Sequence, residues 1–231
     1  MTDNSLPIKN IFWSETAQAY IESHAKEPHP YLKTIREDCK NHKWQFMLTT
    51  KEQAAFLHIL AKILNSKKIL EIGSFYGHST LALASGLTGG GKVISIEHNP
   101  KFAKKTLEHL HASGCGSLVD VLVGEARDML VKVESEHPAQ SFDLCFLDAD
   151  KRHYALYWES ALRLVRPGGV IVVDNAFARG AVFNDHIEQA GHVEAVHQFN
   201  AMVSQDTRVF SFIASMADGM LVAMKPSTHS S

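Results

Sequence analysis

The chain has 231 residues, 45% of them hydrophobic, which is the size and composition of one α/β domain with a full core. Its formal net charge is -2 and no long run of one charge sign occurs, so the sequence lacks the basic surface of a dedicated nucleic-acid binder. No apolar stretch is long enough to cross a bilayer, and the first residues lack the charged and apolar regions of a secretory signal. The cysteines at 39, 115 and 145 are far apart and favour neither a zinc site nor a disulfide. We therefore expect a cytoplasmic protein.

The first 46 residues predict a helical accessory segment. Apolar residues from Trp13 to Ile21 recur on one helical face, and Tyr31 to Lys40 predicts a second short helix. Neither helix belongs to a nucleotide-binding core. We therefore assign residues 1–46 to this segment, 47–225 to the main domain and 226–231 to a polar tail.

In the main domain, strands alternate with helices. Thr50 to Gln53 forms a capping box that starts the first helix of the domain. The expected strands are Lys68–Ile72, Lys92–Glu97, Val119–Val123, Phe142–Asp148, Val170–Asp174, Val209–Ala214 and Met220–Met224. This order predicts an α/β, doubly wound, Rossmann-like sheet of seven mostly parallel strands that ends in an antiparallel hairpin at Asp218-Gly219.

The chain is organised around the strand–turn–helix of residues 68–84. A short apolar strand runs into Gly73, a second glycine follows at Gly77, and a helical pattern begins at Ser79. Glycine lets the backbone approach a ligand, and a helix start offers unpaired N–H groups. The spacing does not match Gly-x-Gly-x-x-Gly, and Glu71 suits a cationic ligand better than a pyrophosphate. These features favour S-adenosylmethionine over a dinucleotide.

Polar residues follow several of the strands, and the carboxyl ends of parallel strands share one edge of a sheet. Glu97 comes 20 residues after Gly77, as expected of an acid that accepts both ribose hydroxyls. The simpler interpretations of Glu97 are a helix cap or a solvated strand end.

Asp148, Asp174 and Asn175 predict a site for a hard cation at the same edge. They offer oxygen ligands without a thiolate or imidazole, which favours Mg²⁺ above all, with Mn²⁺ or Ca²⁺ as alternatives. An Asp-Asn pair can instead simply cap the following loop. Among the 14 histidines, His78 is the exception by its position in the glycine turn, and backbone contact is the better interpretation there than catalysis.

The chain resembles the cation-dependent O-methyltransferases of the caffeoyl-CoA and catechol type, and the resemblance covers about Met47 to Met224. The segments that carry it are Leu70–Ser79, Ile96-Glu97, Val123–Ala126, Phe142–Lys151, Leu164–Gly169 and Val173–Asn175, with Met47–Thr50 before them. The pairing of Leu-Asp-Ala-Asp-Lys with Val-Asp-Asn is the specific mark.

The resemblance implies a role for each matching residue. It implies that the cofactor S-adenosylmethionine is bound by Met47, Thr49, Glu71, Gly73, Ser79, Glu97, Ala126, Asp148 and Asp150. It implies that the metal is held by Asp148, Asp174 and Asn175, and that Lys151 stands at the family's proposed base. A lysine beside a cation, partly desolvated, is expected to have a lowered pKa and to accept a proton; the plain alternative is a surface lysine at a helix start.

These implications predict a metal-dependent O-methyltransferase, acting as a homodimer on a vicinal-dihydroxy aromatic small molecule such as a catechol or caffeoyl compound. The alternative acceptor is a hydroxylated tRNA base. Ala178 stands where many relatives carry tryptophan, in the loop that borders the acceptor pocket, so caffeoyl-CoA itself is not assigned.

Overall fold

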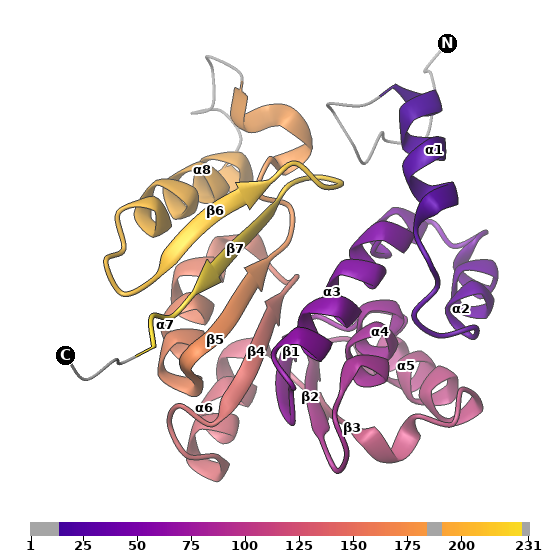
Figure 1. Cartoon of the computed structure of the whole chain (residues 1–231), viewed down its shortest axis with the longest axis horizontal. Coiled ribbons are helices and arrows are strands. Elements are labelled where there is room, and N and C mark those ends of the chain that lie inside the picture. Colours follow the sequence, from indigo (N-terminus) through magenta and orange to yellow (C-terminus); the bar gives the residue numbers. More distant parts are fainter. Residues whose placement is uncertain (1–13, 184–190, 228–231) are drawn as a thin grey trace.

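The computed structural model describes residues 14–183 and 191–227, which form a sheet of seven strands between two layers of helices (Figure 1). The α-helices are α1 (Glu15–His24), α2 (Leu32–Cys39), α3 (Lys51–Ile63), α4 (His78–Gly86), α5 (Pro100–Ala112), α6 (Ala126–Glu136), α7 (Tyr154–Leu164) and α8 (Gly191–Ser204). Short 3-10 helices are η1 (Gln45–Met47), η2 (Gly116–Leu118), η3 (Lys151–His153) and η4 (Ala178–Phe183). Among these helices, none combines the length and the hydropathy that crossing a membrane requires.

The expected sheet is confirmed. Its strands are β1 (Lys68–Ile72), β2 (Lys92–Glu97), β3 (Val119–Val123), β4 (Phe142–Leu147), β5 (Val165–Val173), β6 (Phe210–Ala214) and β7 (Met220–Met224). They lie in the order β3-β2-β1-β4-β5-β7-β6; the first five are parallel, and β7 pairs antiparallel with both β5 and β6. The turn expected at residues 166–169 lies inside β5, where the register with β4 shifts, so this strand starts earlier than predicted.

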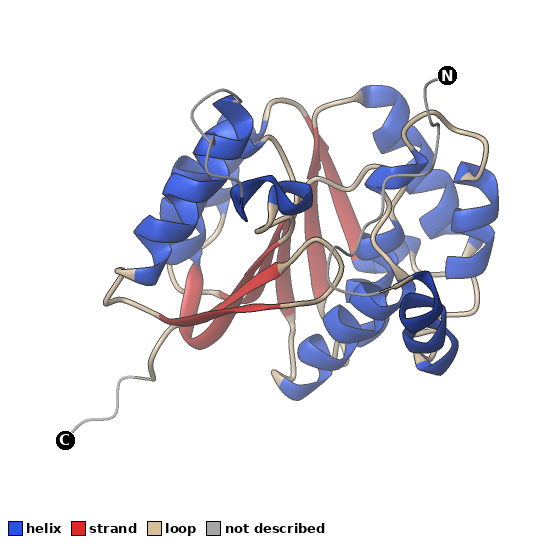
Figure 2. Ribbon diagram, turned by 90° about the horizontal axis from the view of Figure 1, so that it is seen from above, coloured by secondary structure: helices blue, strands red, loops and turns tan. Residues whose placement is uncertain are grey.

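Each face of the sheet is buried under its own helices, which is why the central strands are apolar on both sides (Figure 2). On one face, α6, α7 and α8 contribute Leu130, Trp158 and Phe199 to the core. On the other, α3, α4 and α5 pack with Leu57 and Leu81 among their buried side chains.

Helix α2 belongs to this second layer. Its buried side chains Leu32, Ile35 and Cys39 join the core that covers β1. The expected helix over Tyr31–Lys40 is therefore confirmed within a residue at each end, and it packs on the main domain. Trp13, at the start of the other expected helix, lies outside the described residues.

Candidate active site

The turn after β1 brings two strands so close that only glycine fits. Gly73 has a φ of +100°, and a Cβ there would lie 2.0 Å from the backbone oxygen of Asp148, at the end of β4. Gly77, with a φ of +81°, is the N-cap of α4. The glycines thus let the backbone turn sharply at the carboxyl edge of the sheet, where the strand ends surround a cavity of about 690 Å³.

All the predicted site residues except Glu71 line this one cavity. The lining includes the expected cofactor residues Met47, Thr49, Gly73, Ser79, Glu97, Ala126, Asp148 and Asp150. It also includes the expected base Lys151 and the other two expected metal ligands, Asp174 and Asn175. The structure therefore brings together, at one edge of the sheet, residues that span more than half of the chain.

Glu71 lies behind the wall of the cavity, where it orients the hydroxyl of the lining residue Ser79. Its carboxylate is fully buried and accepts hydrogen bonds from the hydroxyls of Ser79 (2.6 Å), Thr80 (2.5 Å) and Ser95 (2.5 Å). Because the Ser79 hydroxyl gives its proton to Glu71, it presents only acceptor lone pairs to the cavity, as an ammonium group would require. Burial raises the pKa of Glu71 to about 7, against these three hydrogen bonds, which lower it.

Glu97 ends β2 with both carboxylate oxygens already oriented by backbone. Oε2 accepts from the N–H of Phe75 at 2.9 Å, and Oε1 from the N–H of Asn99 at 2.8 Å. The exposed His98 places Nδ1 at 3.2 Å from Oε1. A carboxylate held in this way keeps one orientation toward the cavity, where its remaining lone pairs can accept two neighbouring hydroxyls.

His78 connects the cavity to the N-terminal layer. Its Nδ1 lies 2.8 Å from the hydroxyl oxygen of Thr49, and its Nε2 lies 3.0 Å from Nη1 of Arg36 in α2. Arg36 in turn pairs with Glu27. The sequence favoured backbone contact for His78, whereas these two contacts are made by its ring to side chains.

Lys151 carries its charge beside Asp148. Nζ donates to Oδ1 of Asp148 at 3.1 Å and lies 5.1 Å from the centre of the Tyr154 ring. Burial by itself lowers the pKa of Lys151. Tyr154 and Asp148 together raise it by more than burial lowers it, so the net pKa lies above its ordinary value. The lowered pKa expected from the sequence was that of a lysine beside a cation, whereas here the Lys151 ammonium pairs with the carboxylate of Asp148.

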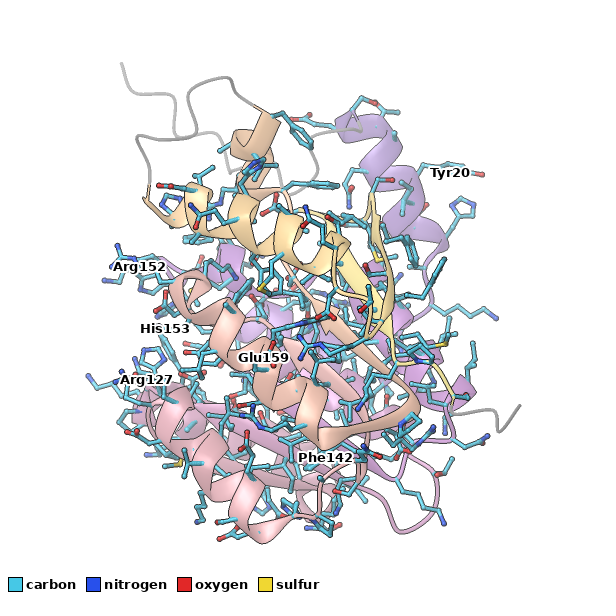
Figure 3. The ribbon with its side chains drawn as sticks, turned by 90° about the vertical axis from the view of Figure 1, so that its left-hand side faces the viewer. Tyr20, Arg127, Phe142, Arg152, His153 and Glu159 are labelled. Atoms are coloured by element: carbon cyan, nitrogen blue, oxygen red, sulfur yellow. The ribbon has the colours of Figure 1, made fainter. Side chains whose placement is uncertain are left out.

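The residues that flank Lys151 are turned differently. The carboxylate of Asp150 accepts from the backbone N–H of Arg152 at 3.3 Å and lies 2.7 Å from Nδ1 of His153, so it caps the start of η3. The labelled side chains of Arg152 and His153 extend outward from the molecule (Figure 3). Of these three successive basic residues, only Lys151 lines the cavity.

Asp174 and Asn175 form the opposite side of the site. Oδ1 of Asp174 accepts from Nε2 of Gln53 at 2.9 Å and from the backbone N–H of Asn175 at 2.7 Å. Asn175 has a φ of 59°, and its Nδ2 donates to the buried Asp218 at 3.2 Å. These bonds fix one carboxylate and one amide on the cavity wall, and Asp148 adds a second carboxylate to the same wall.

The chemistry of this donor set fits a hard divalent cation. Asp148, Asp174 and Asn175 all offer oxygen, the atom that Mg²⁺, Mn²⁺ and Ca²⁺ prefer. In the described part of the chain, no three residues from His, Cys, Asp and Glu are grouped so that they could hold a metal ion. The set above is of another kind, since its third ligand is an amide.

Sequence reasoning missed two residues that orient the expected ligands. The capping box predicted that Gln53 bonds to Thr50, which is confirmed at 2.9 Å, but not that its amide nitrogen reaches Asp174. The sequence predicts Asp218 only as part of a hairpin turn, yet it is buried and holds Asn175. No local signal marks either contact, because the partners lie 121 and 43 residues away.

Comparison with known proteins gives one consistent family. The family model described as "O-methyltransferase" matches residues 22–226. The catechol O-methyltransferase of Niastella koreensis is 37% identical over 177 residues, covering 74% of this chain and 79% of the relative. Caffeoyl-CoA O-methyltransferase 2 of Zea mays is 31% identical over 228 residues, 94% and 85% of the two chains.

Solved structures agree with these relatives. The O-methyltransferase TomG of Streptomyces achromogenes, in complex with SAM, superposes with a TM-score of 0.82 at 30% identity, covering 92% of this chain and 96% of that one. The O-methyltransferase from Bacillus cereus, in complex with SAH, has the same TM-score at 29% identity, covering 91% and 97%.

Proposed function

Since this chain belongs to the O-methyltransferase family, we propose that it methylates one hydroxyl of a vicinal-dihydroxy aromatic small molecule in a reaction that requires a divalent cation. The chain is an S-adenosylmethionine-dependent O-methyltransferase of the catechol and caffeoyl-CoA type. What we propose beyond this activity is the class of the methyl acceptor and the requirement for a divalent cation. Its main support is that Asp148, Asp174 and Asn175 share one cavity with Ser79 and Glu97.

For the cofactor, we assign each end of the cavity by its chemistry. Ser79, oriented as an acceptor by Glu71, suits the ammonium of the methionine part, and Glu97 suits the two ribose hydroxyls. Ala126 would lie against the adenine, and Met47 and Thr49 would close over the bound molecule. Asp148 and Asp150 add negative charge to the cavity lining, which suits a sulfonium.

For the metal, we assign Asp148, Asp174 and Asn175 as protein ligands, with Mg²⁺ as the preferred ion. When bound, such a cation supplies charge that stabilises a phenolate, which is scarce at neutral pH because the pKa of a phenol is about 10. Gln53 and Asp218 keep the two ligands of the 174–175 pair in place.

We assign Lys151 as the base that takes the hydroxyl proton. In the structure its pKa is held up by its neighbours, Asp148 among them. The assignment therefore requires that a cation on Asp148 and Asp174 offsets their charge and lets the pKa of Lys151 fall. The fixed geometry of the cavity supplies the rest, by holding the two reactants in line.

The test is methyl transfer from labelled S-adenosylmethionine to a panel of catechols, with Mg²⁺ and with excess EDTA. We expect activity that EDTA abolishes and that Asp174→Asn reduces at least a hundredfold; this variant keeps the acceptor for Gln53 and removes the charge. Asp128→Asn, an exposed carboxylate on α6, is the control. Activity that is indifferent to EDTA would contradict the metal role.

The other acceptor expected from the sequence, a hydroxylated tRNA base, gains no support from the relatives named above, and we do not propose it. For the compartment we keep the cytoplasm, in line with three cysteines that are all buried.

We also infer a homodimer. Strand β6 lies at the edge of the sheet and exposes Phe210, Phe212 and Ile213. Exposed apolar groups along an edge strand mark a surface that another chain can cover. Light scattering should give twice 25.6 kDa for the wild type and a smaller mass for Phe212→Lys, with the exposed Val131→Lys on α6 as control. A monomeric wild type would contradict this inference.

A further inference from the structure

An arginine and an aromatic ring meet at one end of the active-site cavity. The guanidinium carbon of Arg179, in η4, lies 4.6 Å from the centre of the Phe46 ring, in η1. Both residues line the cavity, together with Ala178, Asn175 and Asp218. The pair therefore joins the loop after β5 to the segment before α3, beside the residues to which we assign the metal.

The backbone that presents Arg179 is held in an unusual conformation. Ala178, Arg179 and Gly180 all have positive φ values, of 45°, 57° and 81°. For alanine and arginine, a backbone with positive φ costs free energy. Such a conformation persists only where neighbouring contacts enforce it. The enforcing contact is the backbone N–H of Arg179, which donates to the buried carboxylate of Asp218 at 2.6 Å. The guanidinium is thus presented from a fixed point next to the proposed metal ligand Asn175.

Charge makes this arginine distinctive among the lining residues. The cavity is lined by six acidic side chains: Glu97, Glu125, Asp148, Asp150, Asp174 and Asp218. Against them stand one lysine and one arginine, and Lys151 is paired with Asp148 at 3.1 Å. Within residues 14–183 and 191–227, the guanidinium of Arg179 forms no ion pair with a carboxylate and lies on the Phe46 ring instead.

A weakly hydrated, planar cation with five N–H donors is suited to a carboxylate, which it can bind with two parallel hydrogen bonds. The contact with the Phe46 ring engages none of these N–H donors with a carboxylate, so they can serve a ligand. In a cavity otherwise rich in carboxylates, an anionic acceptor would be repelled without such a cation.

We propose that Arg179 is a specificity-determining residue that binds an anionic substituent of the methyl acceptor, a carboxylate in particular. This proposal rests on the function proposed above. The preferred substrates of the enzyme are then aromatic vicinal diols that carry an acid group, rather than their neutral analogues. Phe46 positions the guanidinium and supplies an apolar face beside it.

The test compares two acceptors of nearly equal shape, 3,4-dihydroxybenzoate and its neutral amide, 3,4-dihydroxybenzamide. We expect wild-type kcat/KM to favour the carboxylate, and Arg179→Gln to lower that preference about tenfold, mainly through KM, because one charge-assisted interaction is lost. Comparing the ratio of the two acceptors between wild type and Arg179→Gln cancels the difference in their phenol acidities. Arg127→Gln, whose labelled side chain lies on the outer surface of α6 (Figure 3), is the control and should keep the wild-type ratio.

Binding gives a second readout that does not need turnover. The same acceptors are titrated calorimetrically into protein loaded with S-adenosylhomocysteine and Mg²⁺, and Arg179→Gln should weaken the carboxylate alone. If Arg179→Gln weakens both acceptors equally, Arg179 only clamps Phe46 and the proposal is overturned. If neither compound is methylated but the difference in binding persists, the anionic subsite stands and the proposed function fails.

Discussion

Nη1 of Arg36 lies 3.0 Å from Nε2 of His78, 42 residues away along the chain. An arginine nitrogen can only donate, so Nε2 must accept, and the ring is neutral with its proton on Nδ1. That proton faces the hydroxyl oxygen of Thr49 at 2.8 Å, so the buried His78 ties the segment over the cofactor cavity to helix α2. The tautomer of His78 is therefore set by Arg36, a residue of helix α2.

We predict that Arg36→Met weakens cofactor binding more than it slows the methyl transfer. Without Arg36 the ring of His78 can rotate or change tautomer, and Thr49 loses its fixed position. KM for S-adenosylmethionine should rise about five- to tenfold, as for the loss of one interaction of ~1–1.4 kcal/mol, with kcat nearly unchanged. Steady-state kinetics and calorimetry with S-adenosylhomocysteine check this. Lys33→Met, exposed on the same helix, should resemble the wild type; equal effects of the two variants would refute the connection.

Gly73→Ala should destabilise the protein and disrupt the active-site cavity. The new Cβ would lie 2.0 Å from the backbone oxygen of Asp148, and φ is +100°, where alanine is strained. We expect a loss of at least ~3 kcal/mol in the free energy of unfolding and no detectable cofactor binding. Gly89→Ala is the matched control, because nothing lies within 4 Å of a Cβ there. Urea unfolding of both variants gives the result; a stable, cofactor-binding Gly73→Ala would contradict the close approach of β1 and β4.

Glu71 should make the protein less stable as the pH rises from about 4.5 to about 7. Its pKa is raised to about 7 in the folded protein, from 4.5, chiefly by burial. Over this interval the unfolded chain releases the proton while the folded one keeps it, so folding loses up to ~3 kcal/mol by linkage.

Glu71→Gln should remove this dependence, because glutamine has no proton to lose. The difference in unfolding free energy between wild type and variant, measured in urea at pH 5, 6, 7 and 8, should shift in favour of the variant up to about pH 7 and then level off. Glu136→Gln, at an exposed position on α6, serves as the control. A difference that is flat with pH would show that Glu71 titrates normally.

Two variants of Lys151 separate a base from a fixed charge. Lys151→Met should lower kcat at least about a hundredfold, the usual contribution of a positioned base, while S-adenosylhomocysteine still binds. Lys151→Arg keeps the positive charge beside Asp148 but cannot give up its proton near neutral pH. It should therefore be as inactive as the methionine variant. Full activity of Lys151→Arg would assign this position an electrostatic role only.

The parts of the site that the sequence predicted are those set by local chain geometry. Gly73, Ser79 and Glu97 follow from a strand, a glycine turn and a strand end, each visible within a few residues. Asp148 and Asp174 follow from the rule that parallel strands end at one edge. The local sequence pattern thus predicts the sheet, its closing hairpin and the positions of the acidic residues.

What the sequence did not reveal depends on contacts between distant segments. From the sequence, Glu71 is expected at the carboxyl end of its strand. The three hydroxyls that surround it come from α4 and β2, and they keep it behind the wall of the cavity. The neighbours of Lys151 determine the direction of its pKa shift, and no spacing rule supplies them. Arg179 and Phe46 are joined only once the loop after β5 meets the segment before α3.

Strand β7 occupies an inner position in the sheet although it is the last strand in the described part of the chain. Asp218, which holds both Asn175 and the backbone of Arg179, lies two residues before it. During synthesis, β1 to β5 can therefore assemble while β5 still has an open edge and Asn175 lacks its anchor. Asn175 and the loop that presents Arg179 therefore acquire their final geometry only after the segment that contains Asp218 and β7 has been synthesised and has paired with β5.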